Sequence, residues 1–279
     1  LDATLVKCAV SAGACFLPAT RATLEEASRH GRRVTLRQNR QPSRAVARVV
    51  LDCGGLASRL LPEVGWRVLP QSRIGVAASW RNAPMSPPSG VIYMACSKHG
   101  YAGLVRAERG ITNIAAALDP ARCREAGGPA RAVEEILKAA GLSVPDQLDS
   151  MAWRGTPHLS RTRCRVAAER VLILGDAAGY VEPFTGEGMA WALADAAAVF
   201  PFVREAVACW SSGLGERWSR RHANMVRARQ DVCLKVSKWL RHPSLVAAAL
   251  PLLDFVPATV APLMARLNRE LKAGDVVAG

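Results

Sequence analysis

The residues best suited to chemistry lie in one stretch, VLILGDAAGYVEPFTGEGMAWALADAAA, residues 171–198. Its first four residues, 171–174, are all apolar and predict a buried strand. Gly175 ends this strand and Asp176 follows, so a carboxylate stands at the strand's carboxyl end. A carboxylate accepts hydrogen bonds from hydroxyl groups, such as those of a sugar-like chain. The stretch therefore offers a binding group for a polar ligand.

A turn rich in glycine and proline follows the carboxylate and leads into an alanine-rich helical run. Pro183, Gly186 and Gly188 crowd into this turn. The first amides of a helix have no partner within the helix and lie at the positive end of its dipole, so they attract electron-rich groups. A strand, a carboxylate, a glycine-rich turn and a helix in this order predict a site for a polar cofactor. An ordinary strand-turn-helix of an α/β core is the alternative.

The order Gly175-Asp176-Ala177-Ala178-Gly179, Pro183, Gly186-Glu187-Gly188 resembles the Gly-Asp motif of flavoproteins with the p-hydroxybenzoate hydroxylase fold. It is most similar to the geranylgeranyl reductase-like branch. The resemblance implies that Asp176 binds the ribityl chain of FAD and that the loop after Pro183 lies beside the flavin ring. It also implies that the next amides face the N1/O2 edge of the ring, where negative charge develops on reduction. The cofactor-binding residues that it implies are Gly175, Asp176, Pro183, Gly186, Glu187, Gly188 and Met189.

Residues 49–59 are similar to a second flavin motif of the family, in which Ala-Asp-Gly follows an apolar strand and Ser and a basic residue come later. Cys53-Gly54-Gly55 takes the Ala-Asp-Gly place, and Ser58 and Arg59 follow. Gly54 replaces the Asp or Thr that the family uses near the FAD pyrophosphate and links to NAD(P)H. This departure favours a protein electron donor and leaves NAD(P)H as the other candidate. An ordinary strand-to-loop turn is the alternative for this segment.

The Gly-x-Gly-x-x-Gly turn with which such flavoproteins hold the FAD pyrophosphate does not occur in the sequence. The pairs Gly186/Gly188 and Gly213/Gly215 each lack the third glycine. Because the first residue is also Leu1 and not Met, the sequence predicts a fragment of a larger flavoprotein or a truncated gene product. A chain that has lost the turn and does something else is the alternative.

Composition narrows the class further. With 279 residues, half of them hydrophobic, the chain predicts a globular protein of one large domain or two. The net charge of +14 favours anionic partners. Nucleic acid is disfavoured, because no zinc-finger spacing occurs and aromatic residues make up only 5%. None of the eight cysteines forms a C-x-x-C pair, which predicts reduced thiols, no metal site and a cytoplasmic location.

The elements that must position the motifs follow from the apolar periodicity. A helix is predicted over 2–13. A small antiparallel meander is predicted from three runs, with Pro42 in the loop before the last: 20–28, 33–38 and 45–51. An antiparallel sheet is predicted from four runs with Gly-closed hairpins: 74–80, 90–96, 101–106 and 111–118. Helices are predicted at 129–141, 188–210 and 214–241, the last basic and amphipathic.

The predicted fold class is α/β (α+β): a partial Rossmann-like FAD-binding domain with a small β-meander, an antiparallel-sheet substrate domain and C-terminal helices. The FAD-binding domain is discontinuous, 1–60 and 150–210, without an N-terminal βαβ unit. The substrate domain covers 61–149 and the helical region 211–279. The apolar run 243–264 contains Asp254 and several prolines, which disfavours a membrane span. Packing on the substrate side and association with a membrane surface both stay open for it.

The resemblance implies an FAD-dependent oxidoreductase that acts on a small or apolar organic substrate. Two reactions fit it: reduction of isoprenoid-like double bonds, which the wording of the Gly-Asp motif favours, and flavin monooxygenation. It points to no protein nucleophile, so no catalytic residue is assigned. A non-catalytic remnant that binds an apolar ligand or a partner is the alternative from another class. An electron-donor protein and a peripheral membrane contact stay open as partners.

Overall fold

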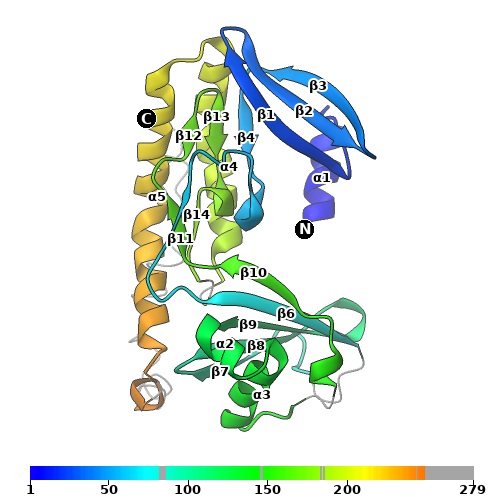
Figure 1. The fold of residues 1–279 in the computed structure, drawn as a ribbon, viewed down its shortest axis with the longest axis vertical. Coiled ribbons are helices and arrows are strands. Elements are labelled where there is room, and N and C mark those ends of the chain that lie inside the picture. The colour runs from blue at the N-terminus through cyan, green and yellow to red at the C-terminus, as the bar shows by residue number, and fades with distance from the viewer. Residues whose placement is uncertain (82–85, 145–146, 183, 185, 243, 249–279) are drawn as a thin grey trace.

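The computed structural model describes residues 1–81, 86–144, 147–182, 184, 186–242 and 244–248. The molecule is elongated (Figure 1). The upper part contains strands from the beginning of the chain and strands from its second half. The lower part is an antiparallel sheet with two helices, and one long helix runs beside both parts. This helix is α5, Ser212–Trp239. The other long helix is α4, Gly188–Ala208, and a short helix, α1, covers Asp2–Ser11.

A small sheet in the upper part carries the Gly-Asp strand. Its order is β12-β13-β4, where β12 is Ala167–Ala168, β13 is Val171–Ile173 and β4 is Val50–Asp52. Strand β13 runs parallel to β4, with Val171 opposite Val50 and Ile173 opposite Asp52. The side chains of β13 are fully buried, which agrees with its unbroken apolar run. The sequence segments 49–59 and 171–189 therefore meet at one edge of this sheet.

The predicted meander is present, but its last strand differs from the prediction. The three antiparallel strands are β1 Thr20–Ser28, β2 Gly31–Gln38 and β3 Gln41–Ala47. Pro42 was placed in a loop, and this is wrong: it pairs with Arg37 inside β3. Strand β3 is an edge strand, where the missing N–H of proline is tolerated. The predicted run 45–51 splits between β3 and β4, which belong to different sheets.

The lower part is a five-stranded antiparallel sheet covered on one face by two helices. Its order is β10-β6-β9-β8-β7. The strands are β6 Ile74–Arg81, β7 Ile92–Ser97, β8 Gly100–Arg106, β9 Ile111–Leu118 and β10 Arg154–His158. The helices are α2 Pro120–Glu125 and α3 Pro129–Ala139, and their buried residues, such as Val133, pack on Leu104 and Ile114. The four predicted strands are confirmed with small shifts, while α2 and β10 were not predicted.

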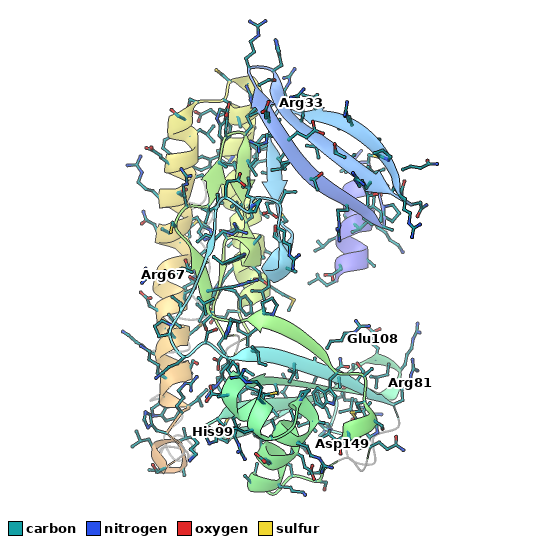
Figure 2. All side chains as sticks on the ribbon, viewed as in Figure 1. Arg33, Arg67, Arg81, His99, Glu108 and Asp149 are labelled. Atoms are coloured by element: carbon teal, nitrogen blue, oxygen red, sulfur yellow. The ribbon has the colours of Figure 1, made fainter. Side chains whose placement is uncertain are left out.

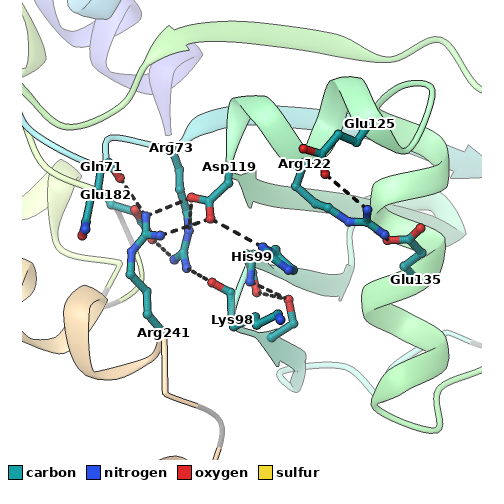
Figure 3. A network of polar contacts seen from close by, with 12 residues as sticks. Gln71, Arg73, Lys98, His99, Asp119, Arg122, Glu125, Glu135, Glu182 and Arg241 are labelled. Carbon is teal, nitrogen blue, oxygen red and sulfur yellow. Dashed lines mark hydrogen bonds and ion pairs between the residues drawn. The ribbon is translucent and has the colours of Figure 1, made fainter.

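A second small sheet and a buried polar network lie between the two parts. The sheet has the order β14-β11-β5, with β5 Trp66–Val68, β11 Arg161–Arg163 and β14 Gly179–Tyr180. In the network, the fully buried guanidinium of Arg73 lies 2.7 Å from a carboxylate oxygen of buried Glu182 (Figure 3). Arg241, beyond the end of α5, makes hydrogen bonds of 3.1 and 3.0 Å to both carboxylate oxygens of Asp119. Ion pairs thus connect the five-stranded sheet to the elements around it.

The mixed α/β fold class is confirmed, and the domain boundaries stay a prediction. The remaining short elements are single 3₁₀ turns: η1 Gly55–Ala57, η2 Glu108–Gly110, η3 Leu148–Ser150 and η4 Gly175–Ala177. Within the described ranges, no helix has the length and apolar character needed to cross a bilayer. Most of the predicted apolar run 243–264 lies outside the described residues.

Candidate cofactor site

The two sequence motifs meet at the carboxyl ends of the parallel strands β4 and β13. The Leu174 amide continues the pairing, because it donates a hydrogen bond of 3.0 Å to the carbonyl of Asp52. Crevices at the carboxyl ends of parallel strands are the usual ligand sites of α/β sheets. A hollow of about 250 Å³ lies at this place. It is lined by Cys53, Gly55, Leu174, Gly175, Asp176, Gly188, Met189, Ala192 and Ala196.

The turn after β4 is closed by a carboxylate of the chain itself. Asp52, almost fully buried, accepts hydrogen bonds from the Gly54 amide at 3.0 Å and from the Ser58 hydroxyl at 2.7 and 2.8 Å. A Cβ atom at position 54 would lie 3.1 Å from Ser58 Oγ and 3.2 Å from Asp52 Oδ1, so glycine suits this tight turn. The departure from the family motif at Gly54 therefore has a packing reason. The role of Asp52, two residues earlier, was not predicted.

The turn after β13 presents the predicted ligand of the ribityl chain. Gly175 opens it with a left-handed φ of 55°, and a Cβ atom there would lie 3.3 Å from Ala192 Cβ. The Asp176 carboxylate is partly buried, and none of the described residues donates a hydrogen bond to it. Burial accordingly raises the pKa of this carboxyl group. An acceptor beside a hollow, with no donor among the described residues, fits the hydroxyl groups of a ligand.

The start of α4 faces the same hollow. Gly188 is the first helical residue, and none of the described side chains caps the first turn. A Cβ atom on Gly188 would lie 3.9 Å from Asp176 Oδ1, so the carboxylate and the helix start are neighbours. Glu187 turns away to accept a hydrogen bond of 3.0 Å from the indole N–H of Trp191. Burial raises the pKa of Glu187, and this hydrogen bond opposes that change.

The structure brings together most of the predicted cofactor-binding residues. Gly175, Asp176, Gly188 and Met189 line the hollow, and Gly186, with a left-handed φ of 75°, and Glu187 form the turn into α4. Pro183 lies outside the described residues. Amides and a carboxylate that have no partner among the described side chains fit a flavin with its ribityl chain, so the residues present suit this part of FAD.

Two residues that the sequence analysis did not identify, Asp195 and His222, form a hydrogen-bonded chain to the Gly-Asp turn. Asp195 in α4 accepts a hydrogen bond of 2.8 Å from the Gly175 amide, and its other oxygen lies 3.0 Å from Nδ1 of His222 in α5. One signal was available: Asp195 is the one acidic residue in the alanine-rich stretch 188–204. His222 also lies four residues after buried Trp218, on the same helix face.

Comparison with known proteins agrees with the geometry. The chain matches the family model described as an FAD binding domain over residues 1–208. No curated protein sequence matches the chain.

The fold is similar to several solved flavoproteins. Flavin-dependent brominase Bmp2 aligns with a TM-score of 0.67 and 11% identity, over 87% of this chain and 64% of that chain. Flavin-dependent halogenase CmlS aligns with a TM-score of 0.64 and 14% identity, over 83% of this chain and 44% of that chain. PqsL, a probable FAD-dependent monooxygenase from Pseudomonas aeruginosa, aligns with a TM-score of 0.55 and 20% identity, over 82% of this chain and 66% of that chain. These low identities establish the fold alone.

The chain thus spans between 44% and 66% of the length of these three flavoproteins. The family match confirms FAD as the predicted cofactor. By this match, which covers more than half of its length, the chain belongs to the FAD-binding domain family.

Proposed function

We propose that the chain is part of an FAD-dependent oxidoreductase and that the hollow between β4, β13 and α4 holds the ribityl chain and the nearby edge of the flavin. The observation that carries this proposal is the Asp176 carboxylate, which receives no hydrogen bond from the described residues and lies beside the start of α4. When bound, the flavin supplies the redox chemistry, and the protein supplies orientation and electrostatics.

The chain's own residues have distinct tasks in this proposal. Asp176 accepts hydrogen bonds from ribityl hydroxyl groups. The amides of Gly188 and Met189, at the positive end of the α4 dipole, stabilise negative charge on the ring edge beside them. Gly188 has no side chain, so a flat ring can approach the helix start closely.

An apolar wall supports a small or apolar substrate. Tyr101 and Leu159 are buried in a cluster that also includes Leu56, Tyr180 and Phe184. The Tyr180 ring also comes within 3.8 Å of the Cβ position at Gly188, so the cluster extends from the five-stranded sheet to the proposed cofactor site. Such a wall excludes water from one side of the site.

Flavin-dependent oxygenation is the first candidate reaction. The structural neighbours are described as halogenases, a brominase and a probable monooxygenase, and this supports oxygen-dependent chemistry. Reduction of isoprenoid-like double bonds is the second candidate, supported by the resemblance of Gly186-Glu187-Gly188 to the motif of the geranylgeranyl reductase-like branch. The electron donor in this proposal is NAD(P)H or a partner protein, with Gly54 favouring the protein.

Flavin binding tests the proposal against a non-catalytic remnant. FAD and riboflavin are titrated into the purified chain while flavin fluorescence is followed. Riboflavin is the sharper probe, because it carries the ribityl chain and ring but no pyrophosphate. We expect both to bind, and Asp176→Ala to weaken both by about 10- to 100-fold, the loss of one or two hydrogen bonds to a charged group.

Asp149→Ala is the matched control, because this carboxylate is exposed in the lower part of the molecule (Figure 2) and should leave binding unchanged. Absence of binding by the unmodified chain would support the remnant. Equal affinity of Asp176→Ala and the unmodified chain would refute the role of Asp176.

A further inference from the structure

A buried carboxylate joins the Gly-Asp turn to the two long helices. Asp195, only 1% exposed, uses Oδ2 to accept the Gly175 N–H at 2.8 Å. Its Oδ1 lies 3.0 Å from Nδ1 of His222, which is also buried. A carboxylate buried among apolar residues is costly unless its oxygens are paired. Here both oxygens are paired, one with the turn and one with α5.

The contact with the turn is geometrically demanding. Gly175 has a left-handed φ, and the Cβ position there lies only 3.3 Å from Ala192 Cβ, one helical turn before Asp195. Helix α4 therefore packs directly on the backbone of the turn, and Asp195 supplies the directional bond at this contact. At the other end of the turn, the guanidinium of Arg163 donates a hydrogen bond of 2.9 Å to the Ala177 carbonyl.

The position of Asp195 also determines where α4 begins relative to Asp176. Gly188 lies seven residues before Asp195, a distance of about 10 Å along a regular helix. Because a helix is rigid over two turns, fixing Asp195 against Gly175 fixes the helix start against the residue that follows Gly175. Both groups that face the proposed flavin, the Asp176 carboxylate and the α4 amides, thus depend on one buried side chain.

Helix α5 completes the arrangement. The indole N–H of fully buried Trp218 donates a hydrogen bond of 3.1 Å to the carbonyl of Ile173, the last residue of β13. His222 follows one helical turn later, and the two rings are 5.9 Å apart. The same face of α5 therefore holds the end of the strand and the carboxylate that holds the turn.

We propose that Asp195, oriented by His222, is a positioning residue of the cofactor site, which sets the Asp176 carboxylate and the start of α4 at the spacing that a flavin requires. This inference rests on the proposed function. It predicts that the site depends on α5, although none of the described α5 side chains lines the hollow.

Riboflavin affinity of the full chain tests the inference, with thermal stability measured in parallel. Asp195→Ala should weaken binding about tenfold or more, because the turn loses its directional bond. Asp195→Asn should stay within about threefold of the unmodified chain, because its amide oxygen still accepts the Gly175 N–H and neutral His222 can accept the amide N–H through Nδ1. Val133→Ala is the control, since it removes buried volume in the distant α3 core.

The outcomes separate this inference from the proposed function. If the unmodified chain binds no flavin, the proposed function fails first. If the unmodified chain binds and Asp195→Ala binds equally well, only the positioning role fails. Should Asp195→Ala not fold, His222→Phe removes one partner and should weaken binding without abolishing the fold; unchanged affinity would overturn the inference. The amide proton shift of Gly175 gives a readout without flavin: it should move in Asp195→Ala or His222→Phe and stay fixed in Val133→Ala.

Discussion

Removing the carboxylate of Glu182 is expected to cost the folded chain about 3–5 kcal/mol. Arg73 is fully buried and its closest carboxylate oxygen, at 2.7 Å, belongs to Glu182. The other acceptors near this guanidinium are more distant, an Asp119 oxygen at 3.5 Å and the Lys98 carbonyl at 3.5 Å (Figure 3). Glu182→Ala therefore leaves a buried cation with poor partners, which is the costly way to break an ion pair.

Urea unfolding followed by far-ultraviolet circular dichroism measures the change in the free energy of unfolding. Glu26→Ala is the control, because this carboxylate is 91% exposed at 3.7 Å from Arg33, and its loss should cost less than about 1 kcal/mol. The double variant Arg73→Met/Glu182→Met should recover most of the loss, because an apolar pair can replace a buried ion pair at little cost. The reasoning fails if Glu182→Ala unfolds like the control, or if the double variant is no more stable than the single one.

Three further substitutions test the environment of the site. Gly175→Ala should lower the free energy of unfolding by about 1–2 kcal/mol in urea titrations, because a left-handed φ and the 3.3 Å approach to Ala192 oppose a Cβ atom; a neutral result would contradict this. Because burial raises the pKa of Asp176 in the folded chain, its contribution to stability is present below the unfolded pKa and lost as pH rises through the folded one. Asp176→Asn should therefore melt higher than the flavin-free unmodified chain at pH 7, with a difference that disappears toward pH 3; a lower melting temperature at pH 7 would count against it. Tyr101→Phe should keep or raise stability by up to about 1 kcal/mol, because the buried hydroxyl has no partner among the described residues while the ring packs on Phe184; a clear loss in urea unfolding would show that the hydroxyl is bonded.

The sequence predicted those elements whose signals are local. Alternating strands with Gly-closed hairpins revealed four strands of the five-stranded sheet, and the run from Val171 to Gly188 revealed a strand, turn and helix in the order that the structure has. The errors in the meander arise because its pairing depends on contacts that no local signal encodes. Pro42 reads as a loop residue unless it is known that β3 is an edge strand. The parallel pairing of β4 with β13 depends on contacts between distant segments, which no local pattern encodes.

The same distinction holds for the site. The proximity of Asp176 and Gly188 could be predicted because both belong to one continuous motif. Asp195 could not, because its partners are a backbone amide twenty residues earlier and a histidine on another helix. Asp52 shows a further limit: the motif drew attention to position 54, while the carboxylate that closes the turn stands two residues before it.

The parallel pair β4–β13 has a consequence for the order of folding. Its strands are about 120 residues apart, so closing that loop costs about 2 kcal/mol more chain entropy than closing a ten-residue hairpin. Two of the four pairings in the five-stranded sheet between them are hairpins of neighbouring strands, and this sheet can form without that closure. During synthesis, a ribosome must translate past residue 173 before the second strand of the pair exists. Competence to hold a flavin is therefore acquired late, after the five-stranded sheet has had time to fold.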